Sequence, residues 1–162
     1  MSASSISVLI VCMGNICRSP MAEGVLRKYL AEHGGDLSVT VDSAGTHGYH
    51  VGHPPDQRAQ NAAAKRGVDI SNLGARRVDP SDFERFDYIL AMDRDNLDSL
   101  LAEAAAEYHD KVRLFLEFSS TNPGADVPDP YYGSVNGFEH VLDLVEDATE
   151  GFLKELQARC RS

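Results

Sequence analysis

Apolar positions along this chain follow two alternating periodicities. Residues 6–11 form a near-continuous apolar run, which is typical of a strand buried on both faces of a sheet. Residues 20–33 carry apolar side chains at helical spacing until a pair of glycines, which predicts a helix that ends there. Apolar and polar residues alternate from 37 to 41, so this segment predicts a second strand that ends at Asp42 and Ser43.

The rest of the chain repeats this order of strand and helix. The predicted elements are a helix over 55–66, a short helical turn that opens at Asp79–Pro80, a strand over 88–92, a helix that Asp93 caps and that runs to about 106, a strand marked by Val112, Leu114 and Leu116, and a last helix over 138–159. Such alternation predicts an α/β fold in which helices cover both faces of a parallel sheet. A length of 162 residues predicts one domain over 1–162.

The turn between the first strand and the first helix carries the most informative residues. Cys12 and Arg18 bracket five residues, and backbone N–H groups in such a turn and at a helix N-terminus converge on an anion. Arg18 adds a bidentate fork for phosphate-type oxygens, and Cys12 lies beneath the anion in a field that favours a nucleophilic thiolate. Gly14 and Asn15 most easily adopt the positive φ of a tight anion cradle, and Pro20 fits the first position of a helix. The predicted phosphate-binding segment is Met13, Gly14, Asn15, Ile16, Cys17, Arg18 and Ser19.

Two further polar residues follow strands of the predicted sheet. Ligands bind beyond the carboxyl ends of parallel strands, so Ser43 after the second strand and Asp93 after the third are expected to converge with the Cys12 turn. The competing interpretation is a buried structural cysteine in an ordinary strand-to-helix turn. The residue types inside the turn and its place after a buried strand favour the anion site.

A long loop over 119–137, rich in proline and glycine, offers the second chemical group. A loop of this length in a compact domain is more often functional than idle. Cleavage of a phosphate ester needs an acid that protonates the leaving oxygen and a base that later deprotonates water. Asp129, between two prolines and followed by Tyr131 and Tyr132, suits both roles. The competing interpretation is a turn-forming Asp-Pro pair beside two packing tyrosines.

Charge and cysteine content narrow the classes of partner. The chain has 25 acidic and 15 basic residues and a formal net charge of −10, which argues against nucleic acid and anionic membrane surfaces. The sequence has no apolar run long enough to insert into a membrane. Its three cysteines are an odd number and two lie in the predicted site, which argues against a disulfide scaffold and favours a cytoplasmic location.

The remaining clusters of charged and titratable residues have plainer interpretations. His47, His50 and His53 are predicted to be solvated loop residues, because their spacing fits no zinc pattern, and no metal site is expected. The pair Arg76–Arg77 is predicted at the surface or at a sheet edge. The solvent-facing side of the last helix is predicted to carry Asp143, Glu146, Asp147 and Glu150.

Over essentially its whole length the chain resembles the low-molecular-weight protein tyrosine phosphatases. The segments that carry the resemblance are, in the order of the family, 11–20 (VCMGNICRSP), 42–46 (DSAGT), 52–56 (GHPPD), 86–93 (FDYILAMD) and 129–132 (DPYY). The resemblance implies a Rossmann-like three-layer sandwich, with a four-stranded parallel sheet flanked by helices. It also implies hydrolysis of phosphotyrosine in two metal-free steps through a cysteinyl-phosphate, with no cofactor.

The resemblance assigns catalytic roles to residues of the predicted site. It makes Cys12 the nucleophile, Arg18 the phosphate clamp, and Asp129 the general acid of the first step and the base of the second. Ser19 would donate a hydrogen bond to the Cys12 sulfur. These roles fit the chemistry, since phosphoryl transfer depends on positioning and on stabilising charge at the non-reacting oxygens.

The resemblance also implies supporting roles. Asn15, held by Ser43, would keep the phosphate loop in its left-handed conformation. Cys17 would form a reversible disulfide with Cys12 that protects the nucleophile from over-oxidation, and simple packing under the loop is the alternative. The walls of a slot for an aromatic substrate would be Tyr49, Tyr131 and Tyr132.

One position departs from the family pattern. Many members carry a histidine in a hydrogen-bond network near the phosphate loop, and Asn72 stands at the corresponding position here. Asparagine can supply a hydrogen bond but does not titrate. The surroundings of the nucleophile are therefore expected to differ in detail from those of such members.

Three alternatives to a phosphotyrosine phosphatase stay open. Protein-arginine phosphatases of the same family tend to have a small threonine where this chain has Ile16. Thiol-coupled arsenate reductases need resolving cysteines in mid-chain, and none lies between Cys17 and Cys160. The third alternative is a catalytically silent module that binds phosphotyrosine proteins. Such a module would not need Cys12, Arg18 and Asp129, which are all present here. The expected partners are phosphotyrosine proteins and, by analogy with bacterial relatives alone, a tyrosine kinase of polysaccharide export.

Overall fold

Strands and helices alternate along the chain as the apolar pattern predicts. The computed structural model describes residues 5–130 and 135–161. Its elements, with 3₁₀ helices labelled η, are β1 (Ser5–Cys12), α1 (Arg18–His33), β2 (Ser38–Gly45), α2 (Gln57–Lys65), α3 (Asp82–Arg85), β3 (Tyr88–Ala91), α4 (Arg94–Glu103), η1 (Ala106–Lys111), β4 (Val112–Leu114), η2 (Phe115–Phe118) and α5 (Val135–Arg161).

The four strands form one parallel sheet in the order β2-β1-β3-β4, which confirms the predicted α/β fold class. Strand β1 pairs along its whole length with β2, and Cys12 lies opposite Gly45. On its other side, Val11 of β1 lies opposite Ala91 of β3. The carboxyl ends of β1, β2 and β3 therefore meet at one edge of the sheet, where ligands bind in folds of this kind.

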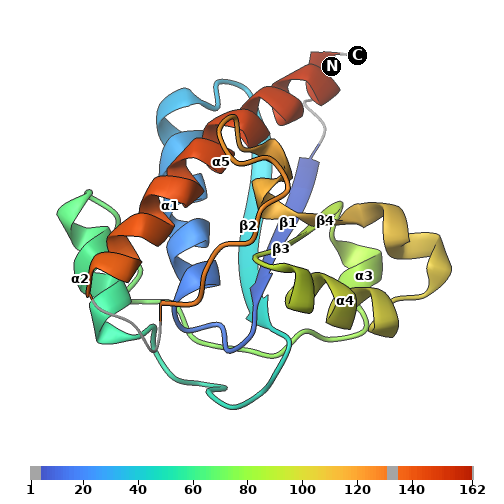
Figure 1. Cartoon of the computed structure of the whole chain (residues 1–162). Coiled ribbons are helices and arrows are strands. Elements are labelled where there is room, and N and C mark those ends of the chain that lie inside the picture. Colours follow the sequence, from blue (N-terminus) through green and yellow to red (C-terminus); the bar gives the residue numbers. More distant parts are fainter. Residues whose placement is uncertain (1–4, 131–134, 162) are drawn as a thin grey trace.

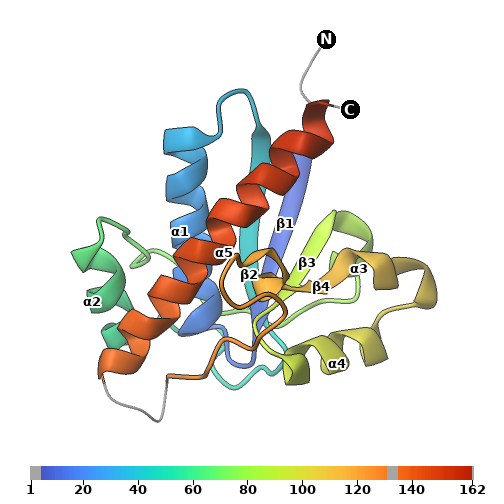
Figure 2. The same ribbon diagram turned by 45° about the horizontal axis from the view of Figure 1, so that its top comes forward.

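Helices cover both faces of the sheet, and each face has its own apolar core. Figures 1 and 2 show α1, α2 and α5 on one side of the sheet and α3 and α4 on the other. Side chains of β1 alternate between the two cores, as a pleated strand requires. Ile10 and Cys12 pack with α1 and α5, whereas Leu9 and Val11 pack with α3 and α4. The nucleophile predicted from the sequence therefore lies on the α1 face.

Several predicted boundaries differ from the structure by a few residues, and the last helix runs over Val135–Arg161 and not 138–159. Strand β2 continues to Gly45, so Ser43 lies inside the strand opposite Ile10 and not at its end. A buried polar side chain interrupts the apolar alternation, which is why the strand looked shorter. Strand β4 ends at Leu114, and Leu116 is buried in the 3₁₀ helix η2 instead of extending the strand. Helix α4 ends at Glu103, because the next residue is already extended, and η1 follows.

Among the described residues, no helix is both long and apolar enough to cross a membrane.

Helix α5 approaches η2 so closely that only a glycine fits at the crossing. A Cβ at Gly151 would lie 1.9 Å from the carbonyl oxygen of Phe118, which is far inside van der Waals contact. Because this atom belongs to the backbone, it cannot turn away as a flexible side chain would. Helix α5 is thus fixed against the segment that leads into the Asp129 loop.

We predict that Gly151→Ala destabilises the protein, although alanine is the better helix former by about 1 kcal/mol. The overlap with Phe118 should lower the free energy of unfolding by about 1–3 kcal/mol, as overpacking does elsewhere. Urea unfolding measures the difference. Gly137→Ala, on the same helix, is the matched control, because its Cβ would meet Pro130 at an ordinary 3.5 Å. Equal losses in the two variants would show that the crossing is not the cause.

Candidate active site

Cys12 is the last residue of β1, and its sulfur lies where the strand turns toward α1. The residue is 3% exposed. Its Sγ accepts a hydrogen bond from the backbone N–H of Asn15 at 3.2 Å and lies 3.0 Å from the Ser19 hydroxyl oxygen. The strand register with β2 and β3 fixes the position of Cys12, and the turn brings two polar groups to its sulfur.

The N-terminus of α1 faces the same turn. The helix begins at Arg18, two residues earlier than predicted, so Pro20 is its third residue and its missing N–H still falls among those without a helical partner. The N-cap residue Cys17 makes no side-chain capping hydrogen bond, and the first turn has no acidic residue. Helices α2 and α4, in contrast, are capped by Asp56 and Asp93. An anion can therefore take the place of a cap at α1.

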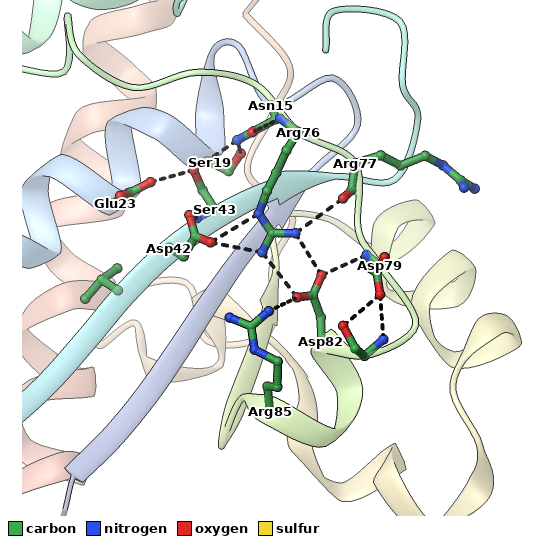
Figure 3. Close-up of polar contacts among 12 residues, drawn as sticks. Asn15, Ser19, Glu23, Asp42, Ser43, Arg76, Arg77, Asp79, Asp82 and Arg85 are labelled. Atoms are coloured by element: carbon green, nitrogen blue, oxygen red, sulfur yellow. Dashed lines mark hydrogen bonds and ion pairs between the residues drawn. The ribbon is translucent and has the colours of Figure 1, made fainter. Parts of the chain in front are cut away.

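Asn15 holds the turn in shape. Its φ is +58°, in the left-handed region, as predicted. Its Nδ2 donates to the hydroxyl oxygens of Ser19 at 2.8 Å and Ser43 at 3.0 Å, and its Oδ1 accepts from the backbone N–H of Arg76 at 3.0 Å. Figure 3 shows these contacts, which join the turn to α1, β2 and the chain before α3. One side chain thus ties the turn to three other segments.

Gly14 does not share this conformation, so the expectation of a positive φ at both residues is wrong for Gly14. Its requirement is space, because a Cβ at this position would lie 3.0 Å from Cδ2 of His50. The loop that carries His50 packs directly against the turn. Glycine leaves room here for the His50 ring, and its backbone freedom is not used.

Arg18 is a buried cation held by neighbouring segments. Its side chain is 3% exposed, and its Nη1 pairs with Asp93 Oδ2 at 2.5 Å and donates to the carbonyl of Val127 at 3.0 Å. Its Nη2 lies 3.7 Å from Asp129 Oδ2. The predicted convergence of Asp93 with the turn is therefore confirmed, and Asp93 does more than cap α4. These contacts place the guanidinium between the Cys12 turn and the Asp129 loop.

The segment that carries Asp129 is attached to the start of α4. The N–H of Val127 donates to the carbonyl of Met92 at 2.8 Å, which continues the pairing beyond β3. Asp126 accepts a hydrogen bond from the backbone N–H of Arg94 at 2.9 Å. Asp129 follows these anchors, and its side chain is about one-third exposed at the pocket.

A pocket of about 280 Å³ opens above the sulfur. Its lining residues are Cys12, Met13, Gly14, Ile16, Cys17, Arg18, Tyr49, His50 and Asp129. Tyr49 is exposed and stacks on the ring of His47, with centroids 5.2 Å apart. Of the three tyrosines expected to line a slot, Tyr131 and Tyr132 lie outside the described residues. The size and mixed lining suit a small aromatic ester of phosphate.

The histidines do not share one environment. His47 and His53 are exposed, as predicted, whereas His50 is half-buried and lines the pocket against Gly14. The expectation of a solvated residue is therefore wrong for His50, because the loop folds back over the turn. Within 5–130 and 135–161, no three His, Cys, Asp or Glu side chains are grouped as they would be around a metal ion.

Cys17 and Cys160 lie in contrasting surroundings. Cys17 is buried beside the pocket, and burial raises the pKa of its thiol, so it stays protonated. Cys160 is an exposed free thiol. The end of α5 that carries it lies beside the start of β1, at the edge of the sheet opposite the pocket (Figures 1 and 2).

Two residues near the turn have contacts that the sequence analysis did not predict. Glu23 is buried on α1, and its Oε1 accepts a hydrogen bond from Ser43 at 2.6 Å. The pair Arg76–Arg77 lies at a sheet edge, as predicted, because Arg77 pairs with Gly45 of the edge strand β2. Arg76 is half-buried, and its guanidinium pairs with Asp42 and Asp82 (Figure 3). A glutamate among the apolar positions of the first helix was the available signal for Glu23. No such signal was available for Arg76, because Asp42 lies 34 residues away and the pattern did not predict a contact with Asp82.

Asn72 takes no part in this network. It is exposed, and the backbone N–H of Arg76 makes the contact with Asn15 instead. The donor to Asn15 Oδ1 in this chain is therefore a backbone N–H, which does not titrate.

The expectation of a solvent-facing acidic side on α5 is confirmed for Asp143 and Glu150, which are exposed, whereas Glu146 and Asp147 are half-buried. Asp143 and Glu146 pair with Arg66 of the chain after α2. Asp147 accepts hydrogen bonds from the hydroxyl groups of three residues at the start of the Asp129 loop, Ser119, Ser120 and Thr121. These bonds, that of Ser119 above all, hold the pKa of Asp147 well below its usual range.

The fold and the site together define an α/β protein with a cysteine beneath an anion-binding turn. A family model for low molecular weight phosphotyrosine protein phosphatases matches residues 7–162. The low molecular weight protein-tyrosine-phosphatase YfkJ of Bacillus subtilis is 40% identical over 152 residues, which cover 94% of this chain and 96% of the relative. The human low molecular weight phosphotyrosine protein phosphatase is 40% identical over 151 residues, which cover 92% and 94%.

A solved structure agrees with these relatives. The crystal structure of protein tyrosine phosphatase from Entamoeba histolytica, with Hepes in its active site, is similar to this chain with a TM-score of 0.91. It is 41% identical and covers 95% of this chain and 98% of its own. The chain belongs to the low molecular weight phosphotyrosine protein phosphatase family, and it is an enzyme of that class.

Asp147→Asn should loosen the start of the Asp129 loop. At pH 7 the variant is expected to lose about 1 kcal/mol or more of unfolding free energy, since a carboxylate accepts these hydroxyl protons better than an amide. The pKa of Asp147 is lower in the folded protein than its usual 3.8, so this stabilisation is complete above that value and is lost as the pH falls below it.

Chemical unfolding of both proteins at pH 7 and pH 3 measures the effect. The difference between wild type and Asp147→Asn should narrow at the lower pH. Glu150→Gln, at an exposed position one turn along α5, is the control and should match wild type at both values. A difference that is the same at pH 3 as at pH 7 would contradict the role of the ionised carboxylate.

Proposed function

We propose that this enzyme hydrolyses phosphotyrosine in proteins through a cysteinyl-phosphate on Cys12. The observation that carries the proposal is the shared pocket, in which Cys12 lies below and Arg18 and Asp129 lie beside one small cavity. The phosphate-binding segment is Met13 to Ser19, and its N–H groups and Arg18 hold the non-reacting oxygens of the phosphate.

In the first step the Cys12 thiolate attacks phosphorus. The S–P bond forms while the P–O bond to the tyrosine ring breaks, and the leaving oxygen takes a proton from Asp129. Arg18 remains ionised and offsets the negative charge of the phosphoryl group. The Ser19 hydroxyl group donates a hydrogen bond to the sulfur, which favours the thiolate over the thiol.

In the second step water attacks the phosphorus of the cysteinyl-phosphate. Asp129, now ionised, accepts a proton from this water, the S–P bond breaks, and Cys12 leaves as a thiolate. Phosphate is released and both residues return to their starting protonation states. Asp129 serves both steps because water attacks the phosphoryl group from the side on which the tyrosine oxygen departed.

The pocket lining supports an aryl phosphate over a phosphorylated arginine. Ile16 is a bulky apolar side chain at the pocket wall, and Tyr49 adds an aromatic ring at its rim. Both suit the flat face of a tyrosine ring, whereas a small threonine was expected in place of Ile16 in arginine phosphatases. Tyr131 and Tyr132 are proposed to complete the slot.

The position of Cys160 argues against a thiol-coupled arsenate reductase. A resolving thiol must reach the sulfur of Cys12 or Cys17, whereas α5 ends at the opposite edge of the sheet (Figure 1). A redox role for Cys17 and an export kinase as a substrate remain predictions from the resemblance. The match of the family model to residues 7–162 supports a single domain over the whole chain.

Matched peptides that carry phosphotyrosine, phosphoserine or phosphoarginine test the substrate class. We expect rapid phosphate release from the phosphotyrosine peptide alone, and none from Cys12→Ser, which lacks the nucleophile. Preference for phosphoarginine would overturn the substrate assignment but keep the mechanism. No release that depends on Cys12 from any peptide would overturn the proposed function.

Asp129→Ala tests the general acid through the leaving group. The variant should lose about 10²–10⁴-fold in the rate of phenyl phosphate cleavage, because phenolate leaves poorly without a proton. It should lose far less with an ester of a strongly acidic phenol, which needs no proton. Asp98→Ala, an exposed carboxylate on α4 outside the pocket lining, is the control. Equal losses with both esters would remove Asp129 from the acid role.

A further inference from the structure

Glu23 is a carboxylate buried next to the catalytic turn that no step of the proposed mechanism uses. It is 2% exposed and pairs with Arg27 of the same helix at 2.6 Å. The hydroxyl group of Ser43 on β2 is its other partner, at 2.6 Å. The charged groups that face it are Arg27 on α1 and Asp42 on β2. Burying a carboxylate is unfavourable unless it is paired, and Arg27 and Ser43 both bind its ionised form.

The ionised carboxylate fixes which way the Ser43 hydroxyl group points. A carboxylate can only accept hydrogen bonds, so the Ser43 proton is directed at Glu23. The lone pairs of the Ser43 oxygen then face Asn15 Nδ2, 3.0 Å away. A side-chain carbonyl oxygen in that place would meet lone pairs instead of a proton. Glu23 therefore requires the NH₂ end of the Asn15 amide to face Ser43.

The same orientation determines the donor at the nucleophile. With its NH₂ group toward the serines, Asn15 donates one proton to Ser43 and the other to Ser19. The Ser19 oxygen is thereby an acceptor, and its own proton is free for the sulfur of Cys12 at 3.0 Å. From Asn15 the hydrogen bonds are donated outward, through Ser43 to Glu23 (Figure 3) and through Ser19 to Cys12.

Arg76 and Glu23 hold the amide from opposite sides. The backbone N–H of Arg76 donates to Asn15 Oδ1 at 3.0 Å. If Glu23 could not accept a hydrogen bond, Ser43 could turn its proton toward Asn15. The Asn15 amide could then flip, so that its oxygen accepts from Ser43 and loses the hydrogen bond from Arg76. In the flipped state Ser19 would donate to Asn15 Oδ1 and no longer to the Cys12 sulfur.

We propose that Glu23 is a positioning residue, which sets the direction of the hydrogen-bond chain so that Ser19 donates to the Cys12 thiolate. This inference rests on the proposed function, in which the thiolate of Cys12 is the nucleophile. Glu23 acts only through Ser43, Asn15 and Ser19, and it touches neither substrate nor sulfur.

A simple effect of charge would have the opposite sign. A negative charge near a thiol disfavours the thiolate, so removing the charge of Glu23 would by itself make Cys12 easier to ionise. Loss of the directed hydrogen bond makes Cys12 harder to ionise. The sign of the change in Glu23→Gln therefore distinguishes the two explanations.

The experiment is the pH profile of Cys12 alkylation by iodoacetamide, followed by mass spectrometry of the Cys12 peptide. In Glu23→Gln, Arg27 should hold the amide oxygen, so that the NH₂ end, which cannot accept, faces Ser43. The pH of half-maximal alkylation rate should then rise by about one unit relative to wild type. Glu32→Gln is the matched control, because Glu32 is an exposed carboxylate of the same helix that pairs with Lys28. Its profile should equal that of wild type. An unchanged or lower midpoint in Glu23→Gln would overturn the proposal.

Ser43→Ala removes the hydroxyl group that would donate to the flipped amide, while the charge of Glu23 stays in place. Alone it should leave the midpoint near that of wild type, because the backbone N–H of Arg76 still holds Asn15 Oδ1. Added to Glu23→Gln, it should bring the midpoint back to that of wild type, as expected for residues that act through one contact. If Glu23→Gln alone does not fold, as judged by thermal unfolding, the double variant decides, and a raised midpoint in it refutes the chain.

Phosphate release from the phosphotyrosine peptide separates this inference from the proposed function. Wild type without turnover that depends on Cys12 would refute the proposed function. Normal turnover in wild type, with equal midpoints in all variants, would refute only the role of Glu23. A raised midpoint should be accompanied by a fall in the turnover rate at acidic pH that is relieved as the pH rises.

Discussion

The left-handed backbone of Asn15 is the constraint on which the site depends. A non-glycine residue in this conformation costs about 1–2 kcal/mol, so the surroundings must impose it. One side-chain amide does so through hydrogen bonds to Ser19, Ser43 and the backbone of Arg76. Two of these partners are held by the fold, since the pairing of β1 with β2 places Ser43 and α1 places Ser19. The geometry of the turn is therefore a property of strand pairing and helix packing, and not of the loop sequence alone.

Arg18 imposes a second requirement, because a buried guanidinium must have its charge matched. Asp93 supplies the match with one oxygen and caps α4 with the other. The β3–α4 junction is thereby joined to the β1–α1 junction, and the carbonyl of Val127 joins the Asp129 loop to both. In a chain of net charge −10, a cation is thus buried beside the Cys12 turn, with Asp93 and Asp129 as its neighbouring carboxylates.

Local signals in the sequence were sufficient for the outline of this site. The strand, the turn from Cys12 to Arg18 and the helix after it lie within one short segment, so residue type and spacing reveal them. Contacts between distant segments were not accessible in this way. The sequence places Asp147 on the polar side of its helix, but only the fold shows which hydroxyl groups it meets. Glu23 was missed for a related reason, because helical periodicity treats a glutamate in an apolar stripe as an exception, whereas the structure shows it paired.

This chain has Asn72 where many family members carry a histidine, and the backbone N–H of Arg76 contacts Asn15. Where a histidine supports the phosphate loop, its ionisation changes the hydrogen bonds it can make within the physiological range of pH. Here a backbone N–H supports Asn15, and the guanidinium of Arg76, between Asp42 and Asp82, holds that backbone in place. Neither the amide nor the guanidinium titrates near neutral pH. Of the groups proposed to orient Asn15, directly or through Ser43, Glu23 is the one that can change its charge, and burial raises the pKa of its carboxyl group.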